Sequence, residues 1–240
     1  MFSPHGPSLW ELATQALSSV ERGYDLLAPK FDHTPFRTPD PVIDATTAAL
    51  RPLGPFERGL DMCCGTGAGM RSLHSLCMGP VVGVDVSAGM LAQAREAAAD
   101  SRWVRADVRV LPFRPGFDLI VTFGSLGHFL PEERPTLMAE VCRALRPGGL
   151  FAFPLGAPPP ATSLANWALT GFDLAMRVRN AVWHPPFVMY YRTWPLHAVR
   201  TDLHHAGFTS TTIPMETLGR RTDGTPRARL VLAHKPHPSE

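Results

Sequence analysis

Short β-rich runs alternate with amphipathic helical segments between residues 59 and 155, and this alternation constrains the fold more than any other feature of the chain. The predicted strands are 59–63, 81–86, 103–108, 117–123 and 149–155. The predicted helices lie near 67–78, 88–99 and 132–145, and the RPGG stretch is expected to end the last one. Because parallel strands need helical crossovers, this repetition predicts a mostly parallel sheet with helices on both faces. Ligands of such sheets bind beyond the carboxyl ends of the strands.

The segments on either side of this core have different patterns. Before it, helical spacing is broken by three prolines, which indicates a helical cap. After it, a Pro-rich connection leads into an aromatic insertion, and a last helix precedes two strands expected near 209–215 and 228–235. We therefore predict a single domain over 1–240 composed of an N-terminal helical cap (1–57), a cofactor-binding core (58–155), a substrate lid insertion (156–194) and a C-terminal helix with edge strands (195–240).

Composition excludes several classes of partner. The chain has 240 residues, with 23 basic and 21 acidic side chains, and its basic residues are mostly scattered arginines. A nucleic-acid surface would need a clustered basic face, so no nucleic-acid partner is predicted. There is no secretion-signal pattern, and no segment approaches the roughly 20 apolar residues that span a bilayer. Four cysteines in this context indicate reduced thiols, so we expect a cytoplasmic protein without membrane association, whose oligomeric state the sequence does not reveal.

The glycine-rich stretch 60–70, LDMCCGTGAGM, forms the predicted turn from the first core strand to the first core helix. A nucleoside-triphosphate P-loop starting at Gly65 would need glycine and lysine where the chain has Met70 and Arg71. The dinucleotide fingerprint G-x-G-x-x-G also fails at Met70. In addition, Asp61 lies just before the turn, where a carboxylate would repel a pyrophosphate. The stretch therefore disfavours both kinds of phosphate site.

The two adjacent cysteines argue against a metal or redox site. Cys63 and Cys64 point to opposite sides of an extended strand and lack C-x-x-C spacing, so no metal is predicted and small buried residues are the favoured interpretation. Asp85, about 20 residues after Asp61, ends the second predicted strand, where a carboxylate can accept bonds from both hydroxyls of a ribose. A nucleoside that carries an ammonium group and no phosphate fits both carboxylates. Either residue could instead be an ordinary cap or turn residue.

With these motifs, the chain resembles the class I S-adenosylmethionine-dependent methyltransferases, in register over about 24–155. The first motif of that family, hydrophobic-Asp-x-Gly-x-Gly-x-Gly, is matched by Asp61, Gly65 and Gly67, with Cys63 in place of the first glycine. The stretch 107–113, DVRVLPF, looks like the family's DxxxLPF motif. FDLIVTFGSLGHF and ALRPGGLFAFP are similar to its fourth strand, active-site loop and fifth strand.

The resemblance implies a Rossmann-like, doubly wound α/β fold with a mostly parallel seven-stranded sheet, an N-terminal helical cap and an aromatic insertion after strand five. It implies S-adenosylmethionine as the cofactor and S-adenosylhomocysteine as the product. The residues that it assigns to cofactor binding are Tyr24, Asp61, Cys63, Cys64, Gly65, Thr66, Gly67, Asp85, Val86, Met90, Asp107, Val108 and Phe123.

His128 is the candidate catalytic residue, because it follows the fourth strand in GSLGHF and an imidazole suits a general base. A histidine that packs locally is the alternative. Tyr24 either closes the cofactor pocket, as the family's cap does, or packs in the core. Arg37 either meets the cofactor carboxylate or is an exposed loop arginine, and His184 is a weaker candidate. The aromatic residues that wall a substrate pocket or form an accessory core are Trp167, Phe172, Trp183, Phe187, Tyr190, Tyr191 and Trp194.

The resemblance implies methyl transfer to an acceptor that the sequence does not identify. The family's Asn/Asp-Pro-Pro-aromatic motif for exocyclic amines is absent, and the loop after the fourth strand has no catalytic cysteine. Together with the uncharged aromatic segment, this favours a small, partly apolar acceptor, with oxygen as the leading accepting atom. Two alternatives stay open. One is a non-catalytic protein that binds the cofactor, or a partner, through the same fold. The other is an NAD-dependent oxidoreductase, which Asp61 and the missing third glycine disfavour.

Overall fold

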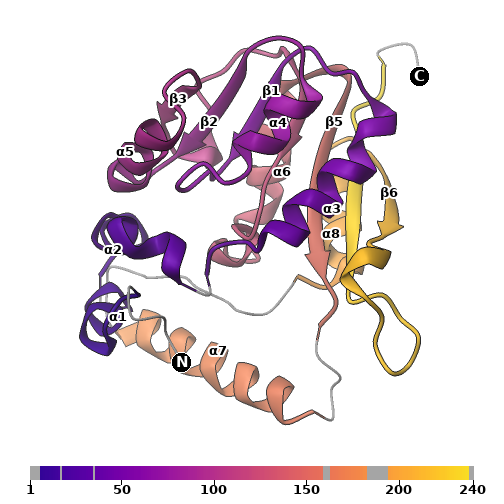
Figure 1. The fold of residues 1–240 in the computed structure, drawn as a ribbon. Helices are drawn as coiled ribbons and strands as arrows, with labels where there is room; N and C mark the ends of the chain where they lie inside the picture. Colours follow the sequence, from indigo (N-terminus) through magenta and orange to yellow (C-terminus); the bar gives the residue numbers. More distant parts are fainter. Residues whose placement is uncertain (1–5, 17, 35, 159–162, 183–193, 238–240) are drawn as a thin grey trace.

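A single seven-stranded sheet organises the chain, in the order β3-β2-β1-β4-β5-β7-β6 (Figure 1). The structure is a computed structural model that describes residues 6–16, 18–34, 36–158, 163–182 and 194–237. Strands β1 to β5 are parallel to one another, whereas β7 is antiparallel to both β5 and β6. The strands are β1 (Gly59–Met62), β2 (Val81–Asp85), β3 (Arg102–Arg105), β4 (Phe117–Val121), β5 (Leu145–Gly156), β6 (Thr209–Pro214) and β7 (Ala228–His234).

Helices cover both faces of this sheet. The α-helices are α1 (Leu9–Ala16), α2 (Val20–Leu27), α3 (Asp40–Leu50), α4 (Met70–Leu76), α5 (Ala88–Ala97), α6 (Arg134–Ala144), α7 (Leu164–Val182) and α8 (Leu196–His205). The 3-10 helices are η1 (Ala28–His33), η2 (Arg51–Leu53), η3 (Val108–Val110), η4 (Leu126–His128) and η5 (Glu216–Leu218). None of the helices in the described ranges has both the length and the apolar character that crossing a bilayer requires.

The alternation of side chains along the strands divides the core into two layers. On β5, Phe151 and Phe153 pack into the layer that α6 and α8 cover, whereas Leu150 and Ala152 pack into the layer that α3 and α4 cover. Successive residues of a strand point to opposite faces, so a run of apolar residues in a parallel strand fills both layers. The doubly wound, mostly parallel α/β fold predicted from the sequence is therefore confirmed.

Several predicted element boundaries differ from the structure by one or more residues, and at three of them the local structure is informative. The third strand ends at Arg105 rather than at residue 108, because Asp107 caps the 3-10 turn η3 and its carboxylate accepts from the backbone N–H of Arg109. The first strand ends at Met62, because Cys63 has a positive φ of 57°. The RPGG stretch follows the end of α6 at Ala144, as expected, but it belongs to β5, where the register against β4 shifts.

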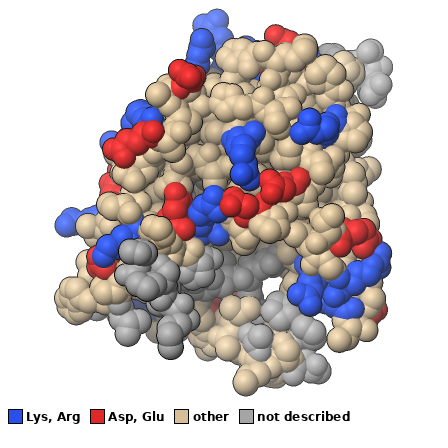
Figure 2. Space-filling model, in the orientation of Figure 1, with Lys and Arg blue, Asp and Glu red and all other residues tan. Residues whose placement is uncertain are grey.

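Three helices from the segments before and after the core lie at one end of the sheet. Figure 1 shows α1, α2 and α7 beyond the carboxyl ends of the parallel strands, while α3 lies along the sheet face. The insertion after β5 contains the 19-residue helix α7. Four members of the predicted aromatic set, Trp183, Phe187, Tyr190 and Tyr191, and the weaker catalytic candidate His184 lie outside the described residues. On the face drawn in Figure 2, basic and acidic side chains are interspersed rather than separated by sign.

Candidate functional site

A cavity of about 740 Å³ lies at the carboxyl ends of the parallel strands. Its walls come from α2, the turn after β1, the end of β2, the loops after β3 and β4, and the end of β5. This volume lies in the range of small-molecule sites, and its position is where open α/β sheets bind ligands. The residues predicted from sequence that line it are Tyr24, Cys63, Gly65, Asp85, Val86, Met90, Asp107, Val108, Phe123 and His128.

The turn after β1 is shaped by positive backbone φ angles. Gly65 has φ 54° and Gly67 has φ 87°, and a Cβ on Gly67 would lie 2.7 Å from the ring of Trp103. Gly67 therefore has to be glycine on both conformational and steric grounds. Cys63 adopts a similar φ of 57° without being glycine, a conformation that costs of order 1–3 kcal/mol. Its side chain lines the cavity, and burial raises the pKa of its thiol.

Asp85 at the end of β2 connects the turn to the next helix. One carboxylate oxygen accepts from the backbone N–H of Gly65 at 2.9 Å, and the other accepts from the N–H of Ser87 at 2.9 Å. Burial raises the pKa of Asp85 against the opposing effect of these hydrogen bonds. The carboxylate therefore faces the cavity from a position that two backbone groups define.

Asp61 lies beneath the turn rather than on the cavity wall. Its exposure is 1%, and a Cβ on Gly69 would lie 2.4 Å from its Oδ2. Burial and the nearby charge of Asp85 raise the pKa of Asp61 well above its usual value. Asp61 is therefore not among the residues that line the cavity, and its contact with a ligand stays a prediction. Three further predicted contact residues, Cys64, Thr66 and Gly67, also lie off the wall.

Asp107, in the loop after β3, is engaged by a basic neighbour that sequence reasoning missed. Its carboxylate accepts from the guanidinium of Arg109 at 2.6–3.0 Å, and Arg109 also pairs with Glu133. Partial burial acts in the opposite direction, but the hydrogen bonds and charge of Arg109 lower the pKa of Asp107. Arg109 and Glu133 both line the cavity, so this end of it carries a paired set of charges.

The helix α2 is anchored onto α5 by Asp25, the neighbour of Tyr24. One oxygen of Asp25 accepts from the Ser87 hydroxyl at 2.6 Å and from the Gly89 N–H at 2.9 Å. Glu21, one turn earlier on α2, pairs with Arg105 at the end of β3. The acidic residue in GYDLL is the feature of the sequence from which this anchor could have been predicted.

Tyr24 and His128 meet at the cavity wall. The Tyr24 hydroxyl and His128 Nε2 lie 2.8 Å apart, and the two rings pack edge to face with centroids 5.2 Å apart. Nearby, the Thr122 hydroxyl donates to the carbonyl of Met62 at 2.7 Å and shares a 2.6 Å hydrogen bond with Ser125. Tyr24 and His128 both line the cavity, so Tyr24 is not simply a residue of the hydrophobic core.

The wall beyond His128 is mainly apolar. It is built from Leu126, Phe129, Leu130, Leu155 and Trp194, of which Trp194 is also part of the main core cluster. The other described members of the predicted aromatic set, Trp167 and Phe172, lie on α7 and do not line the cavity.

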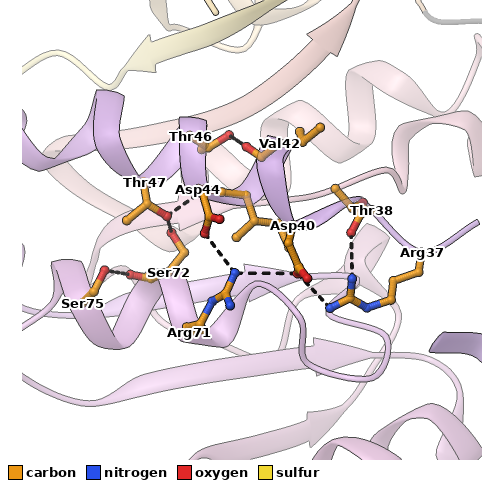
Figure 3. A network of polar contacts seen from close by, with 11 residues as sticks. Arg37, Thr38, Asp40, Val42, Asp44, Thr46, Thr47, Arg71, Ser72 and Ser75 are labelled. Carbon is orange, nitrogen blue, oxygen red and sulfur yellow. Dashed lines mark hydrogen bonds and ion pairs between the residues drawn. The ribbon is translucent and has the colours of Figure 1, made fainter. Parts of the chain in front are cut away.

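Arg37 does not line the cavity either. It pairs with Asp40 at 2.9 Å and with Asp32 at 3.5 Å, and Asp32 accepts from the hydroxyl of Thr66 in the glycine-rich turn at 2.7 Å. Figure 3 shows Arg37 and Arg71 converging on the carboxylate of Asp40. These contacts link the glycine-rich turn, through Asp32, to the start of α3, and the cofactor contact considered for Arg37 stays a prediction. No cluster of His, Cys, Asp or Glu suited to a metal occurs in the described ranges.

Comparisons with known proteins agree with this geometry. Residues 60–149 match a family described as "Methyltransferase domain". The demethylmenaquinone methyltransferase of Beutenbergia cavernae is 32% identical over 173 residues, which cover 67% of this chain and 70% of that protein. An uncharacterized methyltransferase of Synechocystis sp. is 34% identical over 102 residues, which cover 42% of this chain and 47% of that one. The trans-aconitate 2-methyltransferase of an Azoarcus species is 37% identical over 102 residues, which cover 42% of this chain and 40% of that protein. The chain thus spans less than half the length of these last two relatives.

Solved structures share the fold at low sequence identity. A putative O-methyltransferase from Nostoc punctiforme superimposes with a TM-score of 0.66 at 17% identity, covering 92% of this chain and 62% of that one. A structure titled as a DhpI–SAH complex superimposes with a TM-score of 0.65 at 18% identity, covering 96% of this chain and 100% of that one. Likeness at this identity extends to the fold alone.

Proposed function

Because this chain belongs to the class I S-adenosylmethionine-dependent methyltransferases, we propose that it transfers a methyl group from S-adenosylmethionine to a small, partly apolar acceptor, with oxygen as the accepting atom. S-adenosylmethionine is the methyl donor of this family. The observation that carries the proposal is the division of one cavity into a carboxylate-bearing wall at β2 and β3 and a mainly apolar wall after β4 and β5. The cytoplasmic location expected from the sequence stays a prediction.

The residues of the first wall fit an adenosine group. Asp85 offers carboxylate oxygens for ribose hydroxyls, and Asp107 offers an acceptor for an exocyclic amine. Val86, Met90 and Val108 supply apolar surface between them. S-adenosylmethionine carries a positive sulfonium and an ammonium group, and the buried acid Asp61 beneath the turn suits a cation better than the pyrophosphate of a dinucleotide. This charge pattern favours the methyl donor over NAD.

The protein's contribution to the reaction is positioning and the exclusion of water. When bound, S-adenosylmethionine supplies an electrophilic methyl group. The apolar wall of Leu126, Phe129 and Trp194 removes water from the nucleophile, and α2 contributes further residues to the lining of the cavity. A base is needed only where the acceptor must lose a proton, and His128 is the group placed to receive it.

The acceptor class rests on chemistry rather than on any relative. The matched relatives include proteins named for demethylmenaquinone, for trans-aconitate and for malonyl-[acyl-carrier protein], the last an O-methyltransferase. These names span different acceptors, so none transfers to this chain. Oxygen is favoured because the apolar wall, together with a histidine for proton removal, suits a weakly acidic hydroxyl.

Calorimetric titration of the wild type with S-adenosylmethionine, S-adenosylhomocysteine and NADH tests the cofactor assignment. We expect both sulfur nucleosides to bind and NADH not to bind. Hydrogen bonds to a charged group contribute roughly 1.5–3 kcal/mol, so Asp85→Ala should weaken binding by at least about tenfold. Asp100→Ala, which changes an exposed aspartate after α5, is the matched control. Thermal unfolding of each variant verifies that it is folded, with Asp85→Asn as the gentler substitution. Tight NADH binding would reject the proposal.

A panel of phenols, quinols and carboxylates, analysed by mass spectrometry, tests the acceptor class. We expect O-methylated product from at least one member of the panel. A product methylated at nitrogen, carbon or sulfur would reject the oxygen assignment but keep the methyltransferase. Binding of S-adenosylhomocysteine without turnover on any panel member would favour the non-catalytic alternative.

A further inference from the structure

We propose that Tyr24 relays the acceptor's proton to His128, so that the Tyr24 oxygen, and not the imidazole, contacts the acceptor hydroxyl. This inference rests on the proposed function, because it assigns a proton path to methyl transfer onto a hydroxyl. It goes beyond that function by naming a second catalytic residue, contributed by the N-terminal helix α2 rather than by the sheet.

The first observation behind this proposal is the short distance between the side chains of Tyr24 and His128. Tyr24 Oη lies 2.8 Å from His128 Nε2, which is hydrogen-bond distance, and both residues line the cavity. A neutral phenol, with an ordinary pKa near 10, is the natural donor to a neutral imidazole, with an ordinary pKa near 6.5. Nε2 then accepts from Tyr24, and the ring proton of His128 resides on Nδ1. An acceptor hydroxyl can reach Nε2 only by displacing the phenol.

The position of Tyr24 is set by packing, which a relay requires. Its ring meets Phe31 edge to face, with centroids 5.9 Å apart, and packs against the buried Met176 of α7. The adjacent Asp25 ties α2 to the first turn of α5 through Ser87 and Gly89. The phenol ring is therefore held by Phe31 and Met176, and its helix α2 is tied to α5 through Asp25. A reacting group whose position is fixed in this way loses little freedom in the transition state.

The proton balance of the step is complete without any further reactant. The acceptor O–H bond breaks, and its proton passes to Tyr24 Oη, while the Tyr24 proton passes to His128 Nε2. The acceptor oxygen uses the released electron pair to bond the methyl carbon, and the carbon–sulfur bond breaks with its electrons remaining on sulfur. Tyr24 ends neutral, and His128 ends as imidazolium.

Two variants separate a relay from a direct histidine base. With the hydroxyl acceptor that the panel identifies, Tyr24→Phe keeps the ring but removes the relay oxygen, so we expect its turnover to fall about 10²–10⁴-fold, as in His128→Ala. The double variant should be no slower than either single one, since both act in one path. The dissociation constant for S-adenosylhomocysteine should stay within about twofold in each, because the relay assigns both side chains to the acceptor's proton, in place of the cofactor contact that the resemblance implies for Tyr24. Arg22→Gln, an exposed change on the same helix, is the control and should match the wild type.

Different results would overturn the relay and the proposed function. Wild-type turnover in Tyr24→Phe together with loss in His128→Ala would make His128 the direct base and overturn the relay. A tenfold weaker affinity for S-adenosylhomocysteine in Tyr24→Phe would make Tyr24 a cofactor residue and also overturn it. Failure of the wild type to bind S-adenosylhomocysteine would instead reject the proposed function, so the two failures are distinguishable.

A spectroscopic measurement needs no acceptor. Nitrogen-15 NMR of histidine-labelled protein with S-adenosylhomocysteine should show His128 protonated on Nδ1, with Nε2 as a hydrogen-bonded acceptor that changes shift in Tyr24→Phe. A proton on Nε2 in the neutral wild-type ring would leave no site for the phenol's proton and would overturn the relay regardless of turnover.

Discussion

The two walls of the cavity differ in how they are built. The donor wall, formed around Asp85 and Asp107, consists of strand ends and turns whose carboxylates are engaged by backbone N–H groups and Arg109. The acceptor wall, which includes Trp194 and Phe129, is made mostly of side chains that belong to the main hydrophobic core. Changes in the first wall should therefore affect ligand affinity, whereas changes in the second should affect the stability of the whole chain.

The largest expected effect tests the acceptor wall. Trp194 is 7% exposed, and its ring lies 5.2 Å from the guanidinium of Arg134. Trp194→Ala should lower the free energy of unfolding by about 3–5 kcal/mol, because it removes a large buried ring and leaves a cavity. Urea denaturation measures this, with Trp10→Ala, at an 81% exposed position, as the control. A loss below about 1 kcal/mol would show that this wall is separable from the core.

The next effect concerns the acid beneath the donor wall. Burial raises the pKa of Asp61 from 3.8, so its folded state holds a proton more tightly than its unfolded state. The stability that this proton contributes is complete below the unfolded pKa and is lost as pH rises through the folded pKa. Asp61→Asn should therefore gain stability over the wild type as pH increases from about 4 toward neutrality, reaching about 1–3 kcal/mol.

Urea denaturation of the wild type and of Asp61→Asn across that pH range measures the difference between their free energies of unfolding. Because both proteins contain all the other carboxylates, the titration of those groups cancels in this difference. Two parallel stability curves would contradict the prediction. The same variant should weaken S-adenosylmethionine binding, because the cation loses a buried countercharge.

A smaller effect is expected at the partly exposed end of the donor wall. Asp107 is already engaged by Arg109, and its side chain is 40% exposed. Asp107→Asn should therefore weaken S-adenosylhomocysteine binding by only about threefold to tenfold, which corresponds to roughly 0.5–1.5 kcal/mol. Calorimetry checks this against Asp85→Asn, whose loss should be larger. An Asp107→Asn loss equal to or above that of Asp85→Asn would reverse the order of the two contacts.

The smallest effect lies where the two walls meet. Cys63→Gly relieves a positive φ of 57° but gives the unfolded chain more freedom, so the net change in stability should stay below about 1 kcal/mol. Removing the side chain also enlarges the cavity, and S-adenosylhomocysteine affinity should stay equal or improve. Thermal unfolding and calorimetry measure both. A clear loss of affinity would show that the thiol itself contributes to binding.

The sequence predicted the core of this fold because its signals are local. Alternating strand and helix patterns, together with the glycines after β1 and the acid at the end of β2, depend on neighbours within a few residues. The pairing of Tyr24 on α2 with His128 on η4 spans 104 positions, and no periodicity connects two elements at that separation. The contact of Asp107 with Arg109 was also missed, because two charges separated by one residue do not reveal whether they face each other or a ligand. The sequence also indicated that Asp61 lies under the turn, but it could not show that the turn and its neighbours bury this carboxyl to 1% exposure.

One ring restricts how this chain can diverge. The indole of Trp103 occupies the space above Gly67, and a Cβ on Gly83 would lie 2.5 Å from the same ring. A side chain at either glycine therefore collides with the indole for as long as the indole is present. Over generations, a lineage can enlarge Gly83 only after the tryptophan has become smaller, so the order of substitutions is constrained. Gly67 keeps a further restriction from its positive φ even then.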